Sequence, residues 1–476
     1  MAYIQFLGAA GTVTGSKHLL NVSGETTGLG IQVLIDCGLF QGQKEWRQRN
    51  WEPLPIPPNS LECIILTHAH LDHCGYIPRL VKQGFNGPIY ATPATIDLCG
   101  VILPDSGHLQ EEDAAYYNKT HSSKHDPALP LYTEQDALDC MHLFKPVNME
   151  QVVQLSPKLS FRFVRAAHIM GSGMAEIICT DGPTPRKMLF TGDIGRVRDS
   201  QVAPGKVVYA GPYEGEAVDL LVMESTYGNR LHPTTDPRPE LAKTIKDTVA
   251  RGGTIVVPAF AVERTQKFLF MLKDLMETGQ IPRVPVHFDS PMAIKAIEIF
   301  LKHTEEYSEE AKALIQKYGS PLKWENYFFD TKQEDSKKIN DSHFPQIIVS
   351  SSGMATGGRV LHHLLHRLSD PKNTILFIGF QAPGTRGATI KSGARSVKIF
   401  NQDVAIRAHI VTLEQFSDHA DTPELLEWLR TFKKAPQVTY LVHGEPAASS
   451  QLRLAMTSAL GWKVEAAQWM QKVEVK

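Results

Sequence analysis

Residues 67–75 constrain the fold of this 476-residue chain more than any other stretch. They follow an apolar segment, residues 61–66, whose composition is typical of a buried strand. Three imidazoles and one carboxylate lie in the run: His68, His70, Asp72 and His73. A polar loop whose histidines only satisfy backbone groups is the alternative. Four such side chains directly after a buried strand favour a metal site, because they are ligand types that catalytic metals use.

The spacing within this run predicts two metal positions. His68 and His70 are two residues apart, so in an extended segment they point to the same side. Asp72 and His73 come where the chain turns into a helix, and they can therefore aim at a second point nearby. Two cations about 3.5–4 Å apart are the arrangement that two-metal hydrolases use.

Three further side chains repeat the arrangement of an apolar strand followed by one ligand-type residue in a short turn. They are His168, Asp193 and His443. Each of them taken alone is more often an ordinary loop residue. Two metals need more donors than the first four residues supply, so all three become candidate ligands. A carboxylate such as Asp193 can bridge two ions.

Asp36 ends another apolar segment, residues 31–35, and comes just before a turn. It fits a turn-forming aspartate and a carboxylate that orients a metal-bound histidine or water equally well. His419 stands among carboxylates and is typical of a proton donor. Residues 8–17 are rich in glycine, but their spacing fits neither phosphate-binding fingerprint. We therefore expect a tight turn near the site there instead of a nucleotide-binding loop.

Residues 229–415 alternate strands and helices, which predicts a parallel α/β domain of its own. In its Ser/Gly-rich loop, residues 350–359, small side chains let a phosphate approach backbone N–H groups at a helix start. An ordinary glycine-rich turn is the alternative, and the arginine after the strand at 254–257 can equally form a salt bridge. The candidates for phosphate binding are Ser351, Ser352, Gly353, Arg359 and Arg264.

The composition excludes some classes of protein. The net charge of −2 provides no global basic field, so any polyanion site must be a local patch or be made by metal ions and helix ends. We see no signal peptide and no apolar run approaching 18 residues, and expect no membrane partner. The six cysteines form no CxxC pair and are typical of reduced, mostly buried thiols in a cytoplasmic protein.

Taken together, these residues resemble a known family over essentially the whole chain. The metallo-β-lactamase fold is matched in order by Asp36, the run from His68 to His73, His168 and Asp193. Three extra motifs of its β-CASP branch are matched around Glu224, His419 and His443. That branch comprises nucleases such as ribonuclease J and the endonuclease subunit of the pre-mRNA 3′-end cleavage complex.

The resemblance implies an α/β fold, a metallo-β-lactamase αββα sandwich with an inserted β-CASP α/β domain. The first part of the sandwich would span residues 1–228, the insertion residues 229–415 and the second part residues 416–476. In this family, nucleases acting on RNA carry histidine at the third extra motif, as His443 does, whereas DNA-processing relatives typically carry valine. The resemblance therefore implies RNA.

The resemblance also implies a ligand set and a mechanism. One zinc would be held by His68, His70 and His168, and the other by Asp72, His73 and His443. Asp193 would bridge the two zincs, Asp36 would support the ligands, and manganese is the alternative metal. A bridging water with its pKa lowered to about 7 would be the nucleophile. His419, oriented by Glu224, would be the general acid, so the expected catalytic residues are Asp72, Asp193, Glu224 and His419.

We thus expect a zinc-dependent endoribonuclease that hydrolyses phosphodiester bonds of single-stranded RNA in RNA processing or decay. Exonuclease activity and a homodimer are left open. One alternative is a hydrolase of the same fold that acts on a small ester or phosphodiester, which has no need of the inserted domain. The other alternative is a non-catalytic RNA-binding scaffold. Such relatives have lost metal ligands, whereas every ligand position is filled here, which argues against this alternative.

Overall fold

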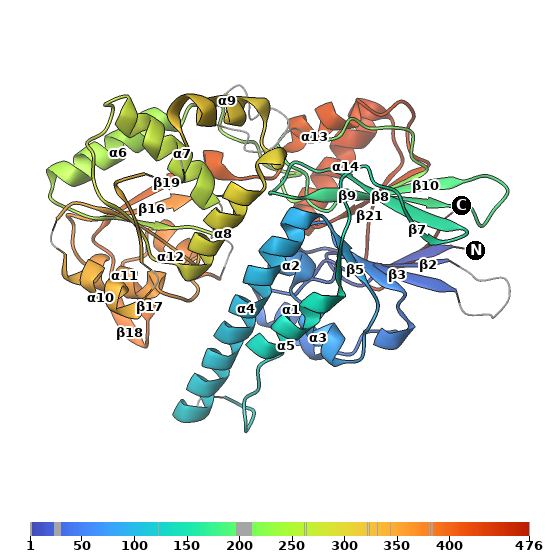
Figure 1. Ribbon diagram of the computed structural model, residues 1–476, viewed down its shortest axis with the longest axis horizontal. Helices are drawn as coiled ribbons and strands as arrows, with labels where there is room; N and C mark the ends of the chain where they lie inside the picture. The colour runs from blue at the N-terminus through green and yellow to red at the C-terminus, as the bar shows by residue number, and fades with distance from the viewer. Residues whose placement is uncertain are drawn as a thin grey trace. The chain divides into compact units, whose positions relative to one another are not determined.

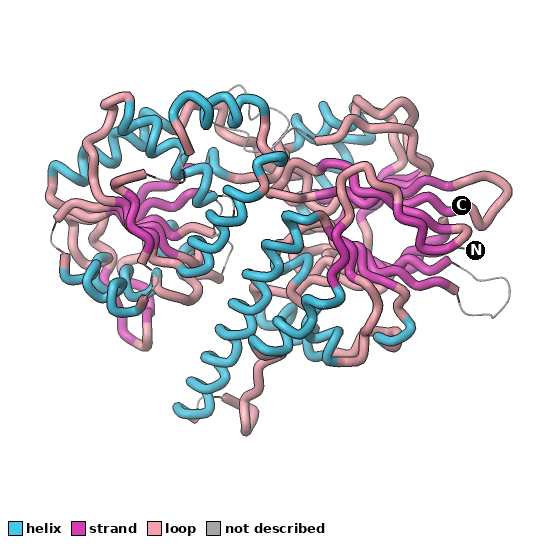
Figure 2. The backbone as a smooth tube through the Cα atoms, viewed as in Figure 1, coloured by secondary structure: helices cyan, strands magenta, loops and turns pink. Residues whose placement is uncertain are grey.

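The computed structural model describes residues 2–22, 30–121, 123–196, 212–260, 262, 264–320, 322, 324–330, 332–342, 344–379, 381 and 384–475. Its contacts divide the chain into two compact units. Unit 1 consists of Met1–Val197, Gly211–Leu231 and Asp418–Lys476, and unit 2 of Arg198–Ala210 and His232–Ser417. Each unit is built around its own strands (Figures 1 and 2).

Unit 1 contains two seven-stranded sheets. The first has the order β22-β1-β2-β3-β4-β5-β6, with β1 Tyr3–Phe6, β2 His18–Val22, β3 Ile31–Ile35, β4 Cys63–Ile65, β5 Ile89–Ala91, β6 Phe144–Pro146 and β22 Lys472–Glu474. The second has the order β21-β20-β11-β10-β9-β8-β7, with β7 Val153–Ser156, β8 Leu159–Arg165, β9 Gly173–Cys179, β10 Arg186–Phe190, β11 Leu220–Glu224, β20 Val438–Val442 and β21 Val464–Ala466.

The two sheets of unit 1 pack face to face. Alternate residues of each strand turn inward, because successive side chains of a strand point to opposite faces. Phe6 and Ile35 of the first sheet and Phe163, Ile177 and Phe190 of the second lie in one buried apolar cluster. The inner faces of the sheets therefore form the core of a sandwich.

Helices cover the outer faces of this sandwich. α13 (Thr422–Leu429) and α14 (Pro446–Leu460) pack Trp428 and Leu452 against Leu221 of the second sheet. Five helices lie outside the first sheet (Figure 1): α1 Lys44–Gln48, α2 Leu71–Cys74, α3 Ile77–Lys82, α4 Pro93–Thr120 and α5 Glu134–Cys140. The predicted αββα layering is confirmed.

The strand directions bring distant loops of unit 1 to one edge. β3 and β4 are parallel, and so are β10, β11 and β20. Parallel strands end at the same edge of a sheet, so the residues that follow them gather there. Asp36, His68, Asp193 and His443 each come within three residues of such a strand end, and Glu224 is the last residue of β11.

Unit 2 has a six-stranded sheet in which every pair is parallel, as the alternation of elements predicts. Its order is β14-β13-β15-β12-β16-β19, with β12 Ile255–Pro258, β13 Val286–Phe288, β14 Tyr327–Phe329, β15 Ile347–Ser350, β16 Thr374–Ile378 and β19 His409–Leu413. The hairpin of this unit is β17 Ser396–Ile399 and β18 Gln402–Ala405. Its helices are α6 Arg238–Ala250, α7 Arg264–Glu277, α8 Pro291–Lys302, α9 Glu309–Tyr318, α10 Gln333–Asp341, α11 Val360–Arg367 and α12 Arg386–Lys391.

The sequence also led to expectations about the cysteines and about membrane-spanning helices. All six cysteines are buried and free, as expected. Among the described residues we find no helix with the length and apolar character needed to cross a bilayer.

Candidate metal centre

The run after β4 places its side chains as the spacing predicts. The chain is extended as far as His70, which is the N-cap of α2 with ψ 144°. His68 and His70 therefore point to the same side, and Nε2 of His68 lies 3.1 Å from Nδ1 of His70. Asp72 and His73 belong to the single turn of α2, which directs them to a different point.

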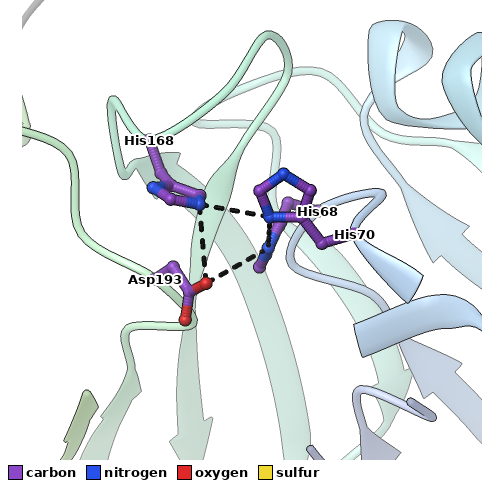
Figure 3. A group of neighbouring side chains, drawn as sticks. All are labelled: His68, His70, His168 and Asp193. Atoms are coloured by element: carbon purple, nitrogen blue, oxygen red, sulfur yellow. Dashed lines mark hydrogen bonds and ion pairs between the residues drawn. The ribbon is translucent and has the colours of Figure 1, made fainter. Parts of the chain in front are cut away.

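A first group of donor atoms combines this run with two other loops (Figure 3). Nε2 of His168 lies 3.3 Å from Nδ1 of His70. Oδ2 of Asp193 lies 3.5 Å from Nε2 of His68 and 3.5 Å from Nε2 of His168. One donor atom from each of the four residues lies within 4.8 Å of the others, so this group has the composition and size to hold one cation.

A second group lies beside the first. Nε2 of His443 lies 3.3 Å from Nε2 of His73 and 3.1 Å from Oδ2 of Asp72. Oδ1 of Asp193 lies 3.4 Å from Nε2 of His73 and 3.2 Å from Nδ1 of His443. Asp193 thus turns one carboxylate oxygen toward each group, as a bridging ligand would.

The histidines of the first group are neutral in the absence of a cation. Burial lowers the pKa of His68 and of His168 well below the usual range, and neighbouring imidazoles lower both further. Burial likewise lowers the pKa of His70 to about 4. A neutral imidazole carries a lone pair, which is the form that binds a metal.

His73 has the opposite shift. Burial lowers its pKa, but the carboxylates of Asp193 and Asp36 outweigh burial and raise the pKa well above the usual range. Burial raises the pKa of Asp193, but His443 and His73 outweigh it and hold the pKa well below its usual range. These carboxylates therefore attract positive charge to the site, and a bound metal would replace the proton on His73.

The hydrogen bonds of Asp36 fix which ring nitrogens face the site. His73 donates from Nδ1 to Oδ2 of Asp36 at 2.7 Å, which leaves the Nε2 lone pair toward the second group. Asp36 also accepts from the backbone N–H of Thr67 at 2.8 Å and from its hydroxyl at 2.9 Å. The same hydroxyl lies 3.1 Å from Nδ1 of His68, so it can accept that N–H and leave Nε2 toward the first group.

The donor set therefore fits divalent metal ions. Ring nitrogens from different histidines lie 3.1–3.3 Å apart, so a cation beside them could bind several at once. Oδ1 of Asp193 is buried and accepts no hydrogen bond from the described residues. Nitrogen and carboxylate donors without thiolates suit zinc and also admit manganese.

The backbone around the site is held in conformations that L-residues rarely adopt. Asp36, Ala167 and His443 have φ of 59°, 59° and 49°. Such conformations cost of order 1–3 kcal/mol each and persist where the surroundings enforce them. A Cβ added at Gly38 would overlap the carbonyl oxygen of Asp72, so only glycine allows the Asp36 turn to pack on the metal-binding loop.

His419 lies beside the first group without joining either one. Its ring centroid lies 4.6 Å from that of His168, and Nδ1 lies 3.1 and 3.2 Å from the two carboxylate oxygens of Glu224. Glu224 is fully buried, and its oxygens also accept from the backbone N–H of Ile194 at 2.6 Å and of Thr226 at 3.3 Å. The His419 ring is therefore oriented by a carboxylate that is itself fixed.

The predicted phosphate-binding residues belong to unit 2 and are engaged within it. Nη1 of Arg359 donates to Oδ1 of the buried Asp289 at 2.7 Å and to the carbonyl of Asp330 at 2.9 Å. The Ser351 hydroxyl lies 3.0 Å from that of Ser290. Arg359 is thus a partner of Asp289 in this structure.

The remaining candidates of this set lie at loop ends. The Ser352 hydroxyl accepts from the backbone N–H of Thr356 at 2.9 Å, and a Cβ at Gly353 would meet the Phe260 ring. The Arg264 guanidinium lies 4.7 Å from the centroid of that ring.

Three residues that support the centre were not predicted from the sequence. The Thr226 hydroxyl lies 3.0 Å from Nδ1 of His443, and the Thr67 hydroxyl links His68 to Asp36. The Tyr227 ring stacks on His419 with centroids 5.9 Å apart and planes 17° apart. Each of them adjoins a motif residue or follows it closely, and this adjacency is the only signal that the sequence carries.

Comparison with known proteins supports the same assignment. The Metallo-beta-lactamase superfamily model matches residues 30–105, the Beta-Casp domain model residues 265–390, and the Zn-dependent metallo-hydrolase RNA specificity domain model residues 403–467. Ribonuclease TTHA0252 of Thermus thermophilus is 35% identical over 439 residues, which is 92% of either chain. The chain belongs to the β-CASP family of the metallo-β-lactamase fold.

Other relatives of this β-CASP protein extend the comparison. Transcription termination factor FttA of Methanocaldococcus jannaschii is 30% identical over 93% of this chain and 67% of its own. An RNase J-like protein of the same organism is 29% identical over 90% of this chain and 89% of its own. A crystal structure of a protein of unknown function from Enterococcus faecalis covers 99% of both chains at a TM-score of 0.52 and 13% identity, which shows the fold alone.

The family membership makes this β-CASP protein a metal-dependent hydrolase, as the resemblance implies. The two metal-binding groups lie entirely in unit 1, which contains the whole superfamily match and part of the match near the C-terminus.

Proposed function

We propose that this β-CASP protein is a ribonuclease that hydrolyses phosphodiester bonds of single-stranded RNA. The observation that carries the proposal is the pair of donor groups that share Asp193, each with the size and ligand types of a divalent metal site. Two adjacent cations of this kind are used by enzymes that displace groups at phosphorus. RNA is the substrate class in the names of the matching RNA specificity model and of the Thermus thermophilus relative.

In this proposal His68, His70 and His168 hold one zinc, Asp72, His73 and His443 hold the other, and Asp193 bridges. When bound, the two ions supply an acidic water at neutral pH and positive charge for the phosphate oxygens. Manganese is the alternative metal.

The protein's own residues then position and protonate. Asp36 fixes the His73 ring directly and the His68 ring through the Thr67 hydroxyl, which keeps Nε2 of both directed at the site. His419 delivers a proton to the leaving 3′-oxygen as the general acid. Glu224 holds the Nδ1 side of His419, so the ring stays oriented.

The Ser350–Arg359 loop of unit 2 contributes substrate binding in the same proposal. Its small side chains would let a phosphate approach the loop, and Arg264 would supply positive charge. Arg359 contributes to RNA binding in two ways: it holds the loop in place through its hydrogen bond to Asp289, and its positive charge attracts the phosphate.

The test is a substrate comparison with purified protein of known metal content. We expect hydrolysis of a labelled single-stranded RNA, loss of that activity after chelation, and recovery on adding zinc. A labelled DNA duplex and a small carboxylic ester serve as the comparison substrates. Hydrolysis of the ester or the duplex without hydrolysis of RNA would contradict the proposal, and so would RNA binding without turnover in the zinc-loaded protein.

A further inference from the structure

On unit 1, three of the six tryptophans have an arginine guanidinium beside the ring, and the proposed mechanism uses none of them. Trp46 and Trp51 belong to the short helical segment after Phe40, and Trp469 lies in the connection from β21 to β22. Trp51 and Trp469 expose 52% and 43% of their surface. Indoles are usually largely buried, so these two exposed ones need an explanation.

Arg49 packs on the first part of this surface. Its guanidinium carbon lies 3.9 Å from the centroid of Trp469 and 4.3 Å from that of Trp46. The Trp46 ring in turn stacks on Phe40, with centroids 6.3 Å apart and planes 13° apart. The guanidinium covers one part of the Trp469 ring, so the 43% of the Trp469 surface that is exposed lies on the rest of the side chain.

Trp51 repeats the arrangement with a second arginine. The guanidinium carbon of Arg79 on α3 lies 5.6 Å from the Trp51 centroid. The surface therefore presents two indoles, each backed by a cation. We call Trp46, Arg49, Trp51, Arg79 and Trp469 the indole–arginine surface.

This surface is anchored to the rest of unit 1. The buried Asn50 accepts from the Phe40 backbone N–H at 2.9 Å and donates to its carbonyl at 2.8 Å. On the other side, the backbone N–H of Met470, next to Trp469, donates to the carbonyl of Phe6 at 2.8 Å. Rigid aromatic groups bind with little loss of conformational entropy, which suits them to recognition.

The surface also lies close along the chain to the metal-binding loop. Cys37 donates its backbone N–H to the carbonyl of His73 at 2.7 Å, and Leu39 donates to that of Leu71 at 2.9 Å. Phe40, on which the Trp46 ring stacks, is the next residue. Phe6 ends β1 at the edge where β3 ends, since β1 and β3 both pair antiparallel with β2. The indole–arginine surface is therefore at the edge of the first sheet that carries the metal ligands.

We propose that the indole–arginine surface binds single-stranded RNA by stacking bases on Trp51 and Trp469. This inference rests on the proposed function and adds a second contact for the same substrate. Aromatic stacking accepts any base, and arginine behind or beside the ring attracts the phosphates. The charges of the segment fit a polyanion, because Lys44, Arg47 and Arg49 outnumber Glu45 and Glu52 in a chain whose net charge is −2.

Binding to RNA is measured with a labelled single-stranded oligonucleotide in the His419→Ala background, in which turnover is slow. We expect Trp51→Ala and Trp469→Ala each to raise Kd about tenfold, within the range for loss of one stacked base. Trp→Phe at either position should stay within about threefold of the parent, whereas Trp→Leu should match Trp→Ala. Leu454→Ala, which removes a side chain that is 59% exposed on α14, is the control and should leave Kd unchanged.

Two further readouts separate stacking from a structural role. RNA should quench the indole fluorescence of the parent, and polyphosphate, which has no bases, should quench it much less. Hydrolysis of a small p-nitrophenyl phosphodiester should be the same in Trp51→Ala and Trp469→Ala as in the wild type, with His419 intact, because that substrate does not reach the surface.

The outcomes distinguish this inference from the function on which it rests. RNA cleavage by the wild type with unchanged Kd in the double Trp51→Ala, Trp469→Ala variant would overturn the inference alone and reassign the surface to protein contacts. Equal affinity of the Phe and Leu variants would also overturn it, since the rings would then serve only to cover the arginines. Failure of the zinc-loaded wild type to cleave or bind RNA would overturn both.

Discussion

Replacing His419 by alanine tests the most specific part of the proposed chemistry. His419 belongs to neither group of metal-binding donors, and its Nδ1 is engaged by Glu224. The variant should therefore keep its metal content. Glu224 retains the backbone donors of Ile194 and Thr226, so its buried charge is still solvated by the protein and the fold survives.

The expected loss of turnover follows from the role of a general acid. Proton transfer from a positioned side chain contributes about 10²–10⁴ in rate. At about 1.36 kcal/mol for each factor of ten, this corresponds to roughly 3–5 kcal/mol in the barrier. The loss of the hydrogen bond to Glu224 lowers the free energy of unfolding by about 1–3 kcal/mol.

The assay compares two leaving groups. An RNA 3′-oxygen is a poor leaving group and needs the proton, whereas p-nitrophenolate leaves without one. We expect kcat of His419→Ala to fall about 10²–10⁴-fold on RNA and less than about tenfold on a p-nitrophenyl phosphodiester. Glu224→Gln, which keeps the side-chain length but not the charge, should show the same selectivity with a smaller loss.

Equal losses on both substrates would refute the assignment of His419 as a proton donor. A zinc content as low as that of His73→Ala would instead place His419 in the ligand set. Both quantities come from the same preparations, by kinetics and by metal analysis, so either result is decisive.

Four further predictions concern the supporting groups. Asp36→Asn should weaken metal binding about 10–100-fold by chelator competition, because an amide cannot accept from both His73 and the Thr67 backbone; unchanged affinity would contradict this. Chelation should lower the melting temperature of the wild type and zinc should restore it, since ions that bind only the folded state stabilise it; a melting temperature insensitive to chelation would argue against a structural contribution. The pKa of Asp289 is lowered, because hydrogen bonds from His363, Ser336 and Arg359 outweigh the effect of burial. The pKa of His363 is also lowered, by burial. Both shifts mean that the unfolded state binds more protons, so the urea midpoint for unit 2 should fall as pH is lowered from 7 to 4, and a flat profile would contradict the pairing. Arg359→Ala should weaken RNA binding more than hydrolysis of a small phosphodiester, and equal losses would remove the loop from substrate binding.

The metal-binding run was predictable because its signal is local. Two histidines separated by one residue must share a side of an extended chain, and the structure places their nitrogens 3.1 Å apart. The sandwich and the parallel inserted sheet were also predictable, since the alternation of apolar residues and the alternation of strands and helices can be read directly from the sequence.

The role of Arg359 could not be predicted in the same way. A serine- and glycine-rich loop with an arginine has the composition of a phosphate site, and the sequence gives no sign of Asp289, which lies 70 residues away. The ion pair depends on β13 and β15 being neighbours in the sheet. The exposure of Trp51 and Trp469 is likewise a property of packing and not of composition.

The sequence by itself determined which metal-binding donors are available and that His68 and His70 are paired by their spacing. It also determined that the chain forms a sandwich and a separate parallel sheet. Only the tertiary structure decided that one oxygen of Asp193 faces each donor group and that Asp36 fixes the His73 ring directly and the His68 ring through Thr67. The physical reason is that side-chain chemistry and period are local properties. The meeting of strand ends depends on the parallel pairing of β3 with β4 and of β11 with β20, and the latter two strands are far apart in the chain.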